Sequence, residues 1–343
     1  MYLMPVSVGS LGNRRWRQDV NSLGGRDTGW LDGDARMELT GCGTALVTPF
    51  RPDGELDEPA LRALVDWQIA SGIGWLLACG STGEAATLST EEWLRVIRIT
   101  VEAAGGRAPV WAGCTHNSTR EAVARAKQAA AIEGVSAILT ANPYYNKPTQ
   151  EGQYQHFKAI ADAVTLPIVL YNVPGRTSAN LEPATVLRLV NDAPNIAAIK
   201  ESSGNLPQIT ELIHLLPSRV KVYAGDDNIA LATIAVGAAG LISVASNVIP
   251  SELTAMVKAA LSGDWPAARC VNRKYYRLIQ ALFWETNPGP VKAVLAMMGR
   301  IGEAYRLPIV PVSAATRSNL QKLIGELGLL GGSPQVDGEP RVI

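Results

Sequence analysis

Short runs of apolar residues alternate with longer segments of helical pattern along most of the chain. Each apolar run ends in small or polar residues, and the eight runs lie at 43–50, 75–84, 109–117, 136–146, 167–177, 196–205, 221–228 and 240–247. After the first run, Leu61, Leu64 and Ile69 recur at helical spacing. After the second, Ser89 and Glu92 have the spacing of a capping box, which predicts the start of a helix. The pattern therefore predicts eight repeats of a strand followed by a helix.

The apolar runs are continuous rather than alternating, which is typical of parallel strands covered on both faces. Eight such units in roughly 200 residues favour an α/β fold of the (β/α)8 TIM barrel type. A doubly wound sheet is the alternative, but no GxGxxG follows the first strand and no GK[ST] follows any strand. We expect the barrel to span 37–249, with a C-terminal helical subdomain over 250–330.

Both ends of the chain differ from this pattern. Residues 1–36 are polar and glycine-rich, and no apolar segment follows their arginines, so they do not resemble a secretory signal. We expect a disordered leader there, and whether the native protein starts at Met1 or at Met37 stays open. The last residues, 331–343, are expected to form a loose tail.

The amino-acid composition and the net charge limit the kinds of partner that the protein is expected to bind. The chain is 47% hydrophobic, and 31 basic and 31 acidic residues give a net charge of zero, so no overall field favours nucleic acid or a membrane surface. No run of about 18 apolar residues predicts a membrane span. The cysteines, Cys42, Cys79, Cys114 and Cys270, are widely spaced and form no CxxC pair. Three of them sit in or beside apolar runs, as buried free thiols would, which fits a reducing cytoplasm. A small-molecule partner fits best.

Lys200 is the lysine that closes an apolar run, in "NIAAIKESSG". Active sites of such barrels lie at the carboxyl ends of the strands, so its amine is expected at the mouth. Burial there disfavours the ammonium form, and a neutral amine can attack a carbonyl to form a Schiff base. The alternative is an ordinary rim lysine paired with Glu201, Asp226 or Glu84. The other lysines considered open a strand or lie in helices or a loop: Lys221, Lys127, Lys158, Lys258, Lys322 and Lys147.

Tyr171 ends the preceding strand, so two adjacent strands would bring a phenol and an amine to the same mouth. Imine formation and hydrolysis both move protons, and a tyrosine linked to hydroxyls can carry them. Thr82 in "GSTGE" and Tyr145 in "NPYYNKP" could complete such a relay. For any single tyrosine, a half-buried ring bonded to water is the alternative.

Two further features could bind carboxylates. The glycines of "GSTGE" allow the amides of Ser81 and Thr82 to face inward as an anion nest, although such a segment is also an ordinary turn. Arg176, in a loop beyond Tyr171, could clamp a second carboxylate or form a surface pair. The three histidines, His116, His156 and His214, are scattered along the chain, and no HExxH occurs. We therefore expect no metal and no other cofactor.

Seven motifs together resemble the dihydrodipicolinate synthases of the pyruvate-dependent class I aldolase family, over about residues 39–330. In chain order the motifs are "GSTGE", "NPYYNKP", "YNVPGRT", "AIKESSGN", "AGDDN", "GLISVASN" and "NPGPVK". The resemblance implies a lyase-type enzyme of lysine (diaminopimelate) biosynthesis that condenses pyruvate with L-aspartate 4-semialdehyde to 4-hydroxy-tetrahydrodipicolinate. Sialic acid and 2-keto-3-deoxy sugar-acid lyases of the family share the lysine and tyrosine, but "YNVPGRT" favours the synthase.

The resemblance also implies roles for residues. Lys200 would form the Schiff base, and Tyr171 would be the general acid and base with Thr82 and Tyr145 in the relay. The Tyr145 position serves a neighbouring subunit across a tight dimer, and a homotetramer built as a dimer of dimers is expected. The implied substrate-binding residues are Ser81, Thr82, Arg176 and Ile242. Positions matching a lysine-binding allosteric pocket are Ala85, Trp93, Asn117, Glu121 and Tyr144, and lysine inhibition is a hypothesis from these.

One alternative belongs to another class of protein. A barrel that binds a keto acid or an amino acid as a sensor, without turnover, could keep the same pocket. Trapping with borohydride separates the two, because only a Schiff-base enzyme gains a stable adduct on Lys200 from pyruvate.

Overall fold

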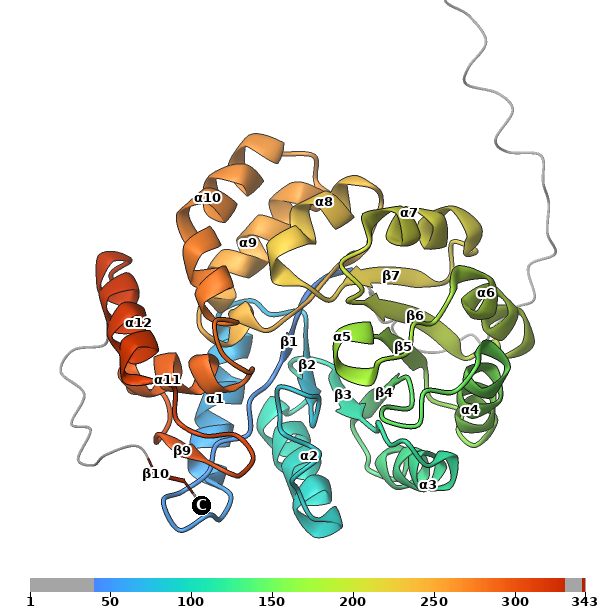
Figure 1. Ribbon diagram of the computed structural model, residues 1–343, viewed down its shortest axis with the longest axis horizontal. Coiled ribbons are helices and arrows are strands. Elements are labelled where there is room, and N and C mark those ends of the chain that lie inside the picture. Colours follow the sequence, from blue (N-terminus) through green and yellow to red (C-terminus); the bar gives the residue numbers. More distant parts are fainter. Residues whose placement is uncertain (1–39, 331–340, 343) are drawn as a thin grey trace, which may run out of the picture. The chain divides into compact units, whose positions relative to one another are not determined.

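Eight parallel strands form a closed barrel at the centre of the computed structural model, which describes residues 40–330 and 341–342 (Figure 1). The strands are β1 (Gly41–Ala45), β2 (Trp75–Ala78), β3 (Val110–Gly113), β4 (Val135–Ala141), β5 (Ile168–Asn172), β6 (Ile196–Glu201), β7 (Lys221–Ala224) and β8 (Gly240–Ser243). They pair in chain order, and β8 closes the ring by pairing with β1. The predicted (β/α)8 barrel is therefore confirmed.

Helices surround the barrel (Figure 1). They are α1 (Glu58–Ala70), α2 (Thr90–Ala104), α3 (Thr119–Ala130), α4 (Gln150–Asp162), α5 (Pro174–Thr177), α6 (Pro183–Asp192), α7 (Leu206–Leu215), α8 (Ala230–Ala235), α9 (Pro250–Leu261), α10 (Trp265–Ala281), α11 (Gly289–Met297) and α12 (Ala314–Glu326). Short 3-10 turns, η1 (Asp227–Ile229) and η2 (Ala245–Asn247), follow β7 and β8. Among these helices of the described residues, none is long and apolar enough to cross a membrane.

The helix α2 begins at the predicted capping box. The Ser89 hydroxyl accepts from the Glu92 amide, and the Glu92 carboxylate accepts from the Ser89 amide at 2.9 Å. The helix ends at Gly105, which adopts the left-handed conformation that glycine tolerates best. Local sequence thus sets both ends of this helix.

The polypeptide after β8 first completes the barrel and then extends it. Helix α9 packs against β1 and α8, the place of the eighth helix of the outer ring, and the predicted boundary at 249 falls just before it. Helices α10, α11 and α12 continue from there, and all described residues fall in one compact unit. The predicted leader at 1–36 lies outside the described residues. Of the predicted tail, 341–342 form β10 (Arg341–Val342), which pairs with β9 (Ala304–Tyr305).

An amide side chain from η2 secures the join between β8 and β1. Asn247 accepts from the Val47 amide and donates to the Ala45 carbonyl at 2.7 Å. These bonds span about 200 positions of sequence. The motif "GLISVASN" thus helps to close the barrel.

Aromatic rings fill the barrel toward the amino ends of its strands. Trp75 and Trp111 stack with centroids 4.9 Å apart, and Tyr223 from the opposite side lies 5.2 Å from Trp75. Gly43 makes room for them, since a Cβ there would lie 2.0 Å from Trp75 Nε1. These rings fill the barrel interior below the mouth, which leaves the space at the carboxyl ends of the strands for a substrate.

Candidate active site

Lys200 and Tyr171 lie side by side near the carboxyl ends of β6 and β5. They are direct partners in the strand register, and the Lys200 Nζ lies 4.5 Å from the centroid of the Tyr171 ring. Both side chains are buried, with Lys200 4% exposed. They line a cavity of about 70 Å³ together with Ala45, Leu77, Gly80, Ser81, Thr82, Leu139, Val173, Arg176, Ser202, Gly225, Asp226, Val244, Phe283 and Asn287. The structure thus brings the predicted amine and phenol to one small enclosed space.

None of the three carboxylates considered as partners for a rim lysine forms an ion pair with Lys200 among the described residues. Glu201 accepts instead from Asn172 and from the Ser203 amide. Glu84 pairs with another lysine. Asp226 lines the cavity, and burial raises the pKa of its carboxyl, although the nearby Lys200 amine opposes this. Within the described chain, Lys200 is therefore a buried amine without an ion pair, and a desolvated lysine can serve as a nucleophile.

The stem of Lys200 depends on a glycine in the next strand end. A Cβ on Gly225 would lie 1.9 Å from the Ser202 Oγ and 3.0 Å from both Cγ and Cε of Lys200. Contacts this short force the neighbouring atoms to move. Gly225 therefore leaves the space in which the lysine extends.

The segment "GSTGE" forms the predicted turn with free amides. The Gly83 amide donates to Gly80, the Glu84 amide donates to Ser81, and the Thr48 hydroxyl holds the Gly83 carbonyl at 2.7 Å. Within the described chain, the amides of Ser81 and Thr82 donate to no protein acceptor. Ser81 and Thr82 both line the small cavity, so an incoming carboxylate could take both hydrogen bonds.

A buried ion pair holds the end of this turn. Lys292 from α11 donates to Glu84 at 2.7 Å, and the two side chains are 0% and 3% exposed. The Lys292 Nζ also lies 4.3 Å from the ring centroid of Phe50. Burial lowers the pKa of Lys292 and raises that of Glu84, and each charge opposes the shift of the other. The sequence analysis did not predict this pair. The feature that could have indicated it is the position of Lys292 within the apolar stretch "VKAVLAMMG".

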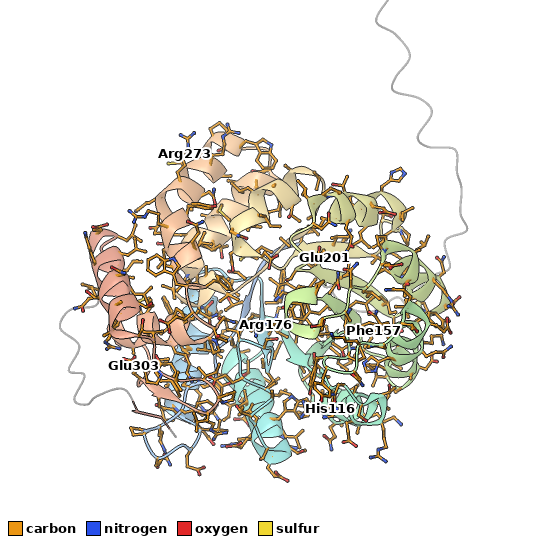
Figure 2. The ribbon with its side chains drawn as sticks, in the orientation of Figure 1. His116, Phe157, Arg176, Glu201, Arg273 and Glu303 are labelled. Carbon is orange, nitrogen blue, oxygen red and sulfur yellow. The ribbon has the colours of Figure 1, made fainter. Side chains whose placement is uncertain are left out.

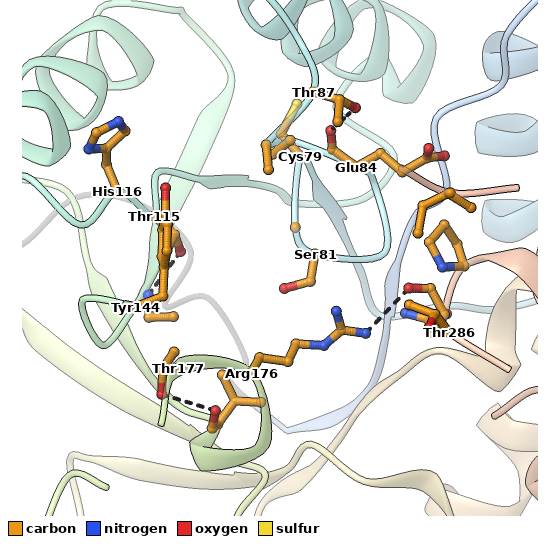
Figure 3. Close-up of a pocket in the computed structure, with 18 of the residues that line it drawn as sticks. Cys79, Ser81, Glu84, Thr87, Thr115, His116, Tyr144, Arg176, Thr177 and Thr286 are labelled. Atoms are coloured by element: carbon orange, nitrogen blue, oxygen red, sulfur yellow. Dashed lines mark hydrogen bonds between the residues drawn. The ribbon is translucent and has the colours of Figure 1, made fainter. Parts of the chain in front are cut away.

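Arg176 extends from α5 across the mouth of the barrel (Figure 2). Its Nη2 donates to the main-chain carbonyl of Asn287 at 3.4 Å, and its side chain crosses a larger cavity of about 330 Å³ (Figure 3). The larger cavity adjoins the small one, because Gly80, Ser81, Val173, Arg176 and Asn287 line both. Arg176 thus lies where the small cavity meets the larger one.

Two predicted site residues lie apart from this arrangement. Tyr145 is 87% exposed and does not line either cavity. Ile242 is fully buried in β8, and Val244, two residues further along, lines the small cavity instead. The role of Tyr145 in a neighbouring subunit stays a prediction.

Two of the five positions matched to an allosteric pocket line the larger cavity, and the other three are not among the residues that line it. Ala85 and Tyr144 line the larger cavity. Trp93 is fully buried, and its indole donates to the Gly113 carbonyl at 2.9 Å. The Asn117 carbonyl accepts from Asn146, and Glu121 pairs with Arg120 on the surface. Neither Asn117 nor Glu121 lines the larger cavity. Lysine inhibition through these residues stays a prediction.

Across the described residues, no group of three or more His, Cys, Asp or Glu side chains is arranged to hold a metal ion. The second aspartate of "GDDN", Asp227, serves the backbone instead. It is buried and accepts from the amides of Val244 and Ala245 and from the Ser243 hydroxyl. Three of the four cysteines are buried free thiols as predicted, and Cys270 is exposed.

Comparison with known proteins agrees with this geometry. Residues 38–327 match the model of the dihydrodipicolinate synthetase family. The chain is 68% identical over 298 residues to a 4-hydroxy-tetrahydrodipicolinate synthase of Acidobacterium capsulatum, covering 87% of this chain and 99% of that one. It is 60% identical over 294 residues to the same-named protein of Koribacter versatilis, and the match covers 86% of this chain and 98% of that one.

Solved structures give the same result. A dihydrodipicolinate synthase of Aquifex aeolicus superposes with a TM-score of 0.84 at 39% identity, over 86% of this chain and 100% of that one. The dihydrodipicolinate synthase of Acinetobacter baumannii, solved in complex with pyruvate, superposes with a TM-score of 0.83 at 43% identity. The match covers 85% of this chain and 100% of that one. The relatives and the family model match nearly the whole described length of this barrel, including the buried strand-end lysine beside a tyrosine. The chain therefore belongs to the dihydrodipicolinate synthetase family.

Proposed function

We propose that this protein condenses pyruvate with L-aspartate 4-semialdehyde through a Schiff base on Lys200, giving 4-hydroxy-tetrahydrodipicolinate for lysine biosynthesis. The observation that carries the proposal is the Lys200 amine, which is buried, has no ion pair among the described residues and lies 4.5 Å from the Tyr171 ring centroid. Family membership and the relatives of the same name support the reaction, and the pyruvate complex of the Acinetobacter baumannii enzyme supports the first substrate.

The first half of the reaction uses the small cavity. The amides of Ser81 and Thr82 bind the pyruvate carboxylate, which presents the ketone carbon to the Lys200 amine. Attack gives a carbinolamine, loss of water gives the protonated imine, and removal of a methyl proton gives the enamine. Tyr171 accepts and returns these protons, with Thr82 as its neighbour in the relay.

The second half uses the larger cavity. Arg176 binds the carboxylate of the semialdehyde, and the enamine carbon attacks its aldehyde carbon. The amino group of the semialdehyde then displaces Lys200 at the imine carbon, which closes the ring and frees the enzyme. In this proposal Tyr145 reaches the site of a neighbouring subunit across a tight dimer. The proposed assembly is a homotetramer, built as a dimer of dimers, and the proposed location is the cytoplasm.

The test is a coupled assay with both substrates, together with borohydride reduction in the presence of pyruvate. The parent should turn over and gain one stable adduct on Lys200, whereas Lys200→Ala should do neither. Lys221→Ala is the matched control, because Lys221 opens the adjacent strand β7 at the opposite end of the barrel and donates to the Ser218 carbonyl. An adduct without turnover would instead indicate a related lyase, and no adduct would indicate a sensor.

A further inference from the structure

The side chain of Asn287 reaches the active site from the loop before α11. Its Nδ2 donates to the Thr82 Oγ1 at 3.0 Å, a contact between residues 205 positions apart. Both side chains are buried, with Thr82 3% and Asn287 5% exposed. Asn287 also lines both cavities, so it belongs to the wall of the site.

This bond decides where the Thr82 proton can point. A threonine hydroxyl has one proton to donate and accepts through its oxygen. Since the oxygen accepts from Asn287, the proton must point elsewhere. Among the described residues the Thr82 hydroxyl donates to no protein acceptor, and it lines the same 70 Å³ cavity as Lys200 and Tyr171. The hydroxyl therefore offers its proton to the cavity.

Asn287 is itself held in place by its main chain. Its carbonyl accepts from Arg176 at 3.4 Å, and five residues later Lys292 is locked to Glu84 of the same turn that carries Thr82. The amide oxygen of Asn287, Oδ1, is buried without a partner in the described chain, so the side-chain nitrogen makes the one side-chain hydrogen bond. A side chain anchored in this way can hold a neighbouring hydroxyl in a fixed orientation.

We propose that Asn287 is a positioning residue for the Schiff-base chemistry: its amide donates to the Thr82 oxygen and so directs the Thr82 proton toward the cavity that holds Lys200 and Tyr171. The inference rests on the proposed function and adds a residue from the C-terminal helical part to its proton relay. Asn287 does not touch the reacting atoms in this role, because it acts through Thr82.

The test compares Asn287→Ala and Asn287→Asp in the parent and in a Thr82→Val background. Asn287→Ala should lower kcat about 10- to 100-fold, a loss typical of a disturbed proton transfer. KM for the semialdehyde should change little, because Arg176 contacts the main chain of Asn287. Asn287→Asp, which has the same shape but can only accept, should lower kcat at least as much, because it draws the Thr82 proton away from the cavity.

The double variants separate positioning from general damage. In the Thr82→Val background, Asn287→Ala should lower kcat less than about two-fold further, because residues that act as a unit are not additive. Full additivity, or an Asn287→Asp variant as active as the parent, would overturn the proposal. Asn195→Ala is the matched control, since Asn195 uses its amide to donate to Ala161 and Val164 at the other end of the barrel. It should lower stability and leave kcat unchanged.

A second readout keeps this inference distinct from the choice of substrate. The rate of the borohydride-trapped pyruvate adduct on Lys200 requires imine formation but no semialdehyde, and it should fall in Asn287→Ala and Asn287→Asp alike. If the parent traps pyruvate but does not turn over the semialdehyde, the proposed function fails and the trapping rates decide the inference. If the parent traps no pyruvate, both proposals are wrong.

Discussion

At the scale of single residues, the surroundings of Lys200, the proposed nucleophile, lack both an ion-pair partner and a bulky neighbour beside its stem. The three carboxylates that could have neutralised it are engaged elsewhere or leave it without an ion pair, and Gly225 leaves open the space beside its stem. A buried amine without an ion pair is costly to maintain in a core, which is why such groups concentrate at functional sites. The cavity is therefore shaped by small residues as much as by reactive ones.

Gly225→Ala should disable the site while the protein still folds. The added Cβ would lie 1.9 Å from Ser202 Oγ and 3.0 Å from the Lys200 stem, so the amine must shift. A misplacement of about 1 Å can cost about 100-fold in rate. Turnover and the yield of borohydride-trapped pyruvate adduct check this. Gly302→Ala is the control, because the nearest atom to its Cβ would be the Phe50 carbonyl oxygen at 3.8 Å, and equal activity of the two variants would contradict the expectation.

At the scale of elements, α3 and α4 meet through a buried histidine. His156 of α4 shares a hydrogen bond of 2.9 Å with the Thr119 hydroxyl of α3, and it packs edge-on against Phe157. Burial lowers the pKa of His156 from 6.5 to about 4. The folded protein therefore holds this ring neutral where the unfolded chain would protonate it.

The free energy of unfolding should fall as the pH drops through 6.5, and this His156 contribution should level off near pH 4. The unfolded state binds the proton first, so acid favours it, by up to about 3 kcal/mol over that range. His156→Gln removes the titration and should flatten this part of the pH dependence, measured by urea denaturation. His214→Gln is the control, because that side chain is exposed on α7. An unchanged slope in His156→Gln would contradict the assignment.

At the scale of the whole molecule, two contacts attach the C-terminal helical part to the turn that carries Ser81 and Thr82. Asn287 bonds to Thr82 and Lys292 bonds to Glu84, at sequence separations of 205 and 208. The loop before α11 and the helix itself thus contact the wall of the candidate active site. Their loss would leave Lys200 and Tyr171 in the strands but would free the turn beside them.

Lys292→Met should destabilise the protein by about 3–5 kcal/mol, because it leaves Glu84 buried without its partner. The double variant Glu84→Gln/Lys292→Met should recover most of this loss, since no charge then remains unpaired. Urea denaturation at neutral pH measures both. A single variant as stable as the parent would show that Glu84 does not depend on Lys292.

Sequence patterns predicted the parts of the fold that depend on neighbours in the chain. The eight apolar runs, the capping box of Ser89 and Glu92, and the place of Lys200 at a strand end are all local signals, and the structure has each of them. Asn287 and Lys292 escaped prediction as partners of the site because their contacts join residues more than 200 positions apart. Nothing in the local pattern of "NPGPVK" indicates which turn it meets.

The bond between Asn287 and Thr82 also determines when, during synthesis of the chain, the site can be completed. At about 5–20 residues per second of synthesis, the ribosome needs about 10–40 s to proceed from Thr82 to Asn287. In the later part of that interval, once residue 200 has been made, the nascent chain holds Lys200 but still lacks the amide that bonds to the Thr82 hydroxyl and the lysine that pairs with Glu84. The enzyme therefore gains its chemistry in the last stage of its own translation, after every strand of the barrel has been made.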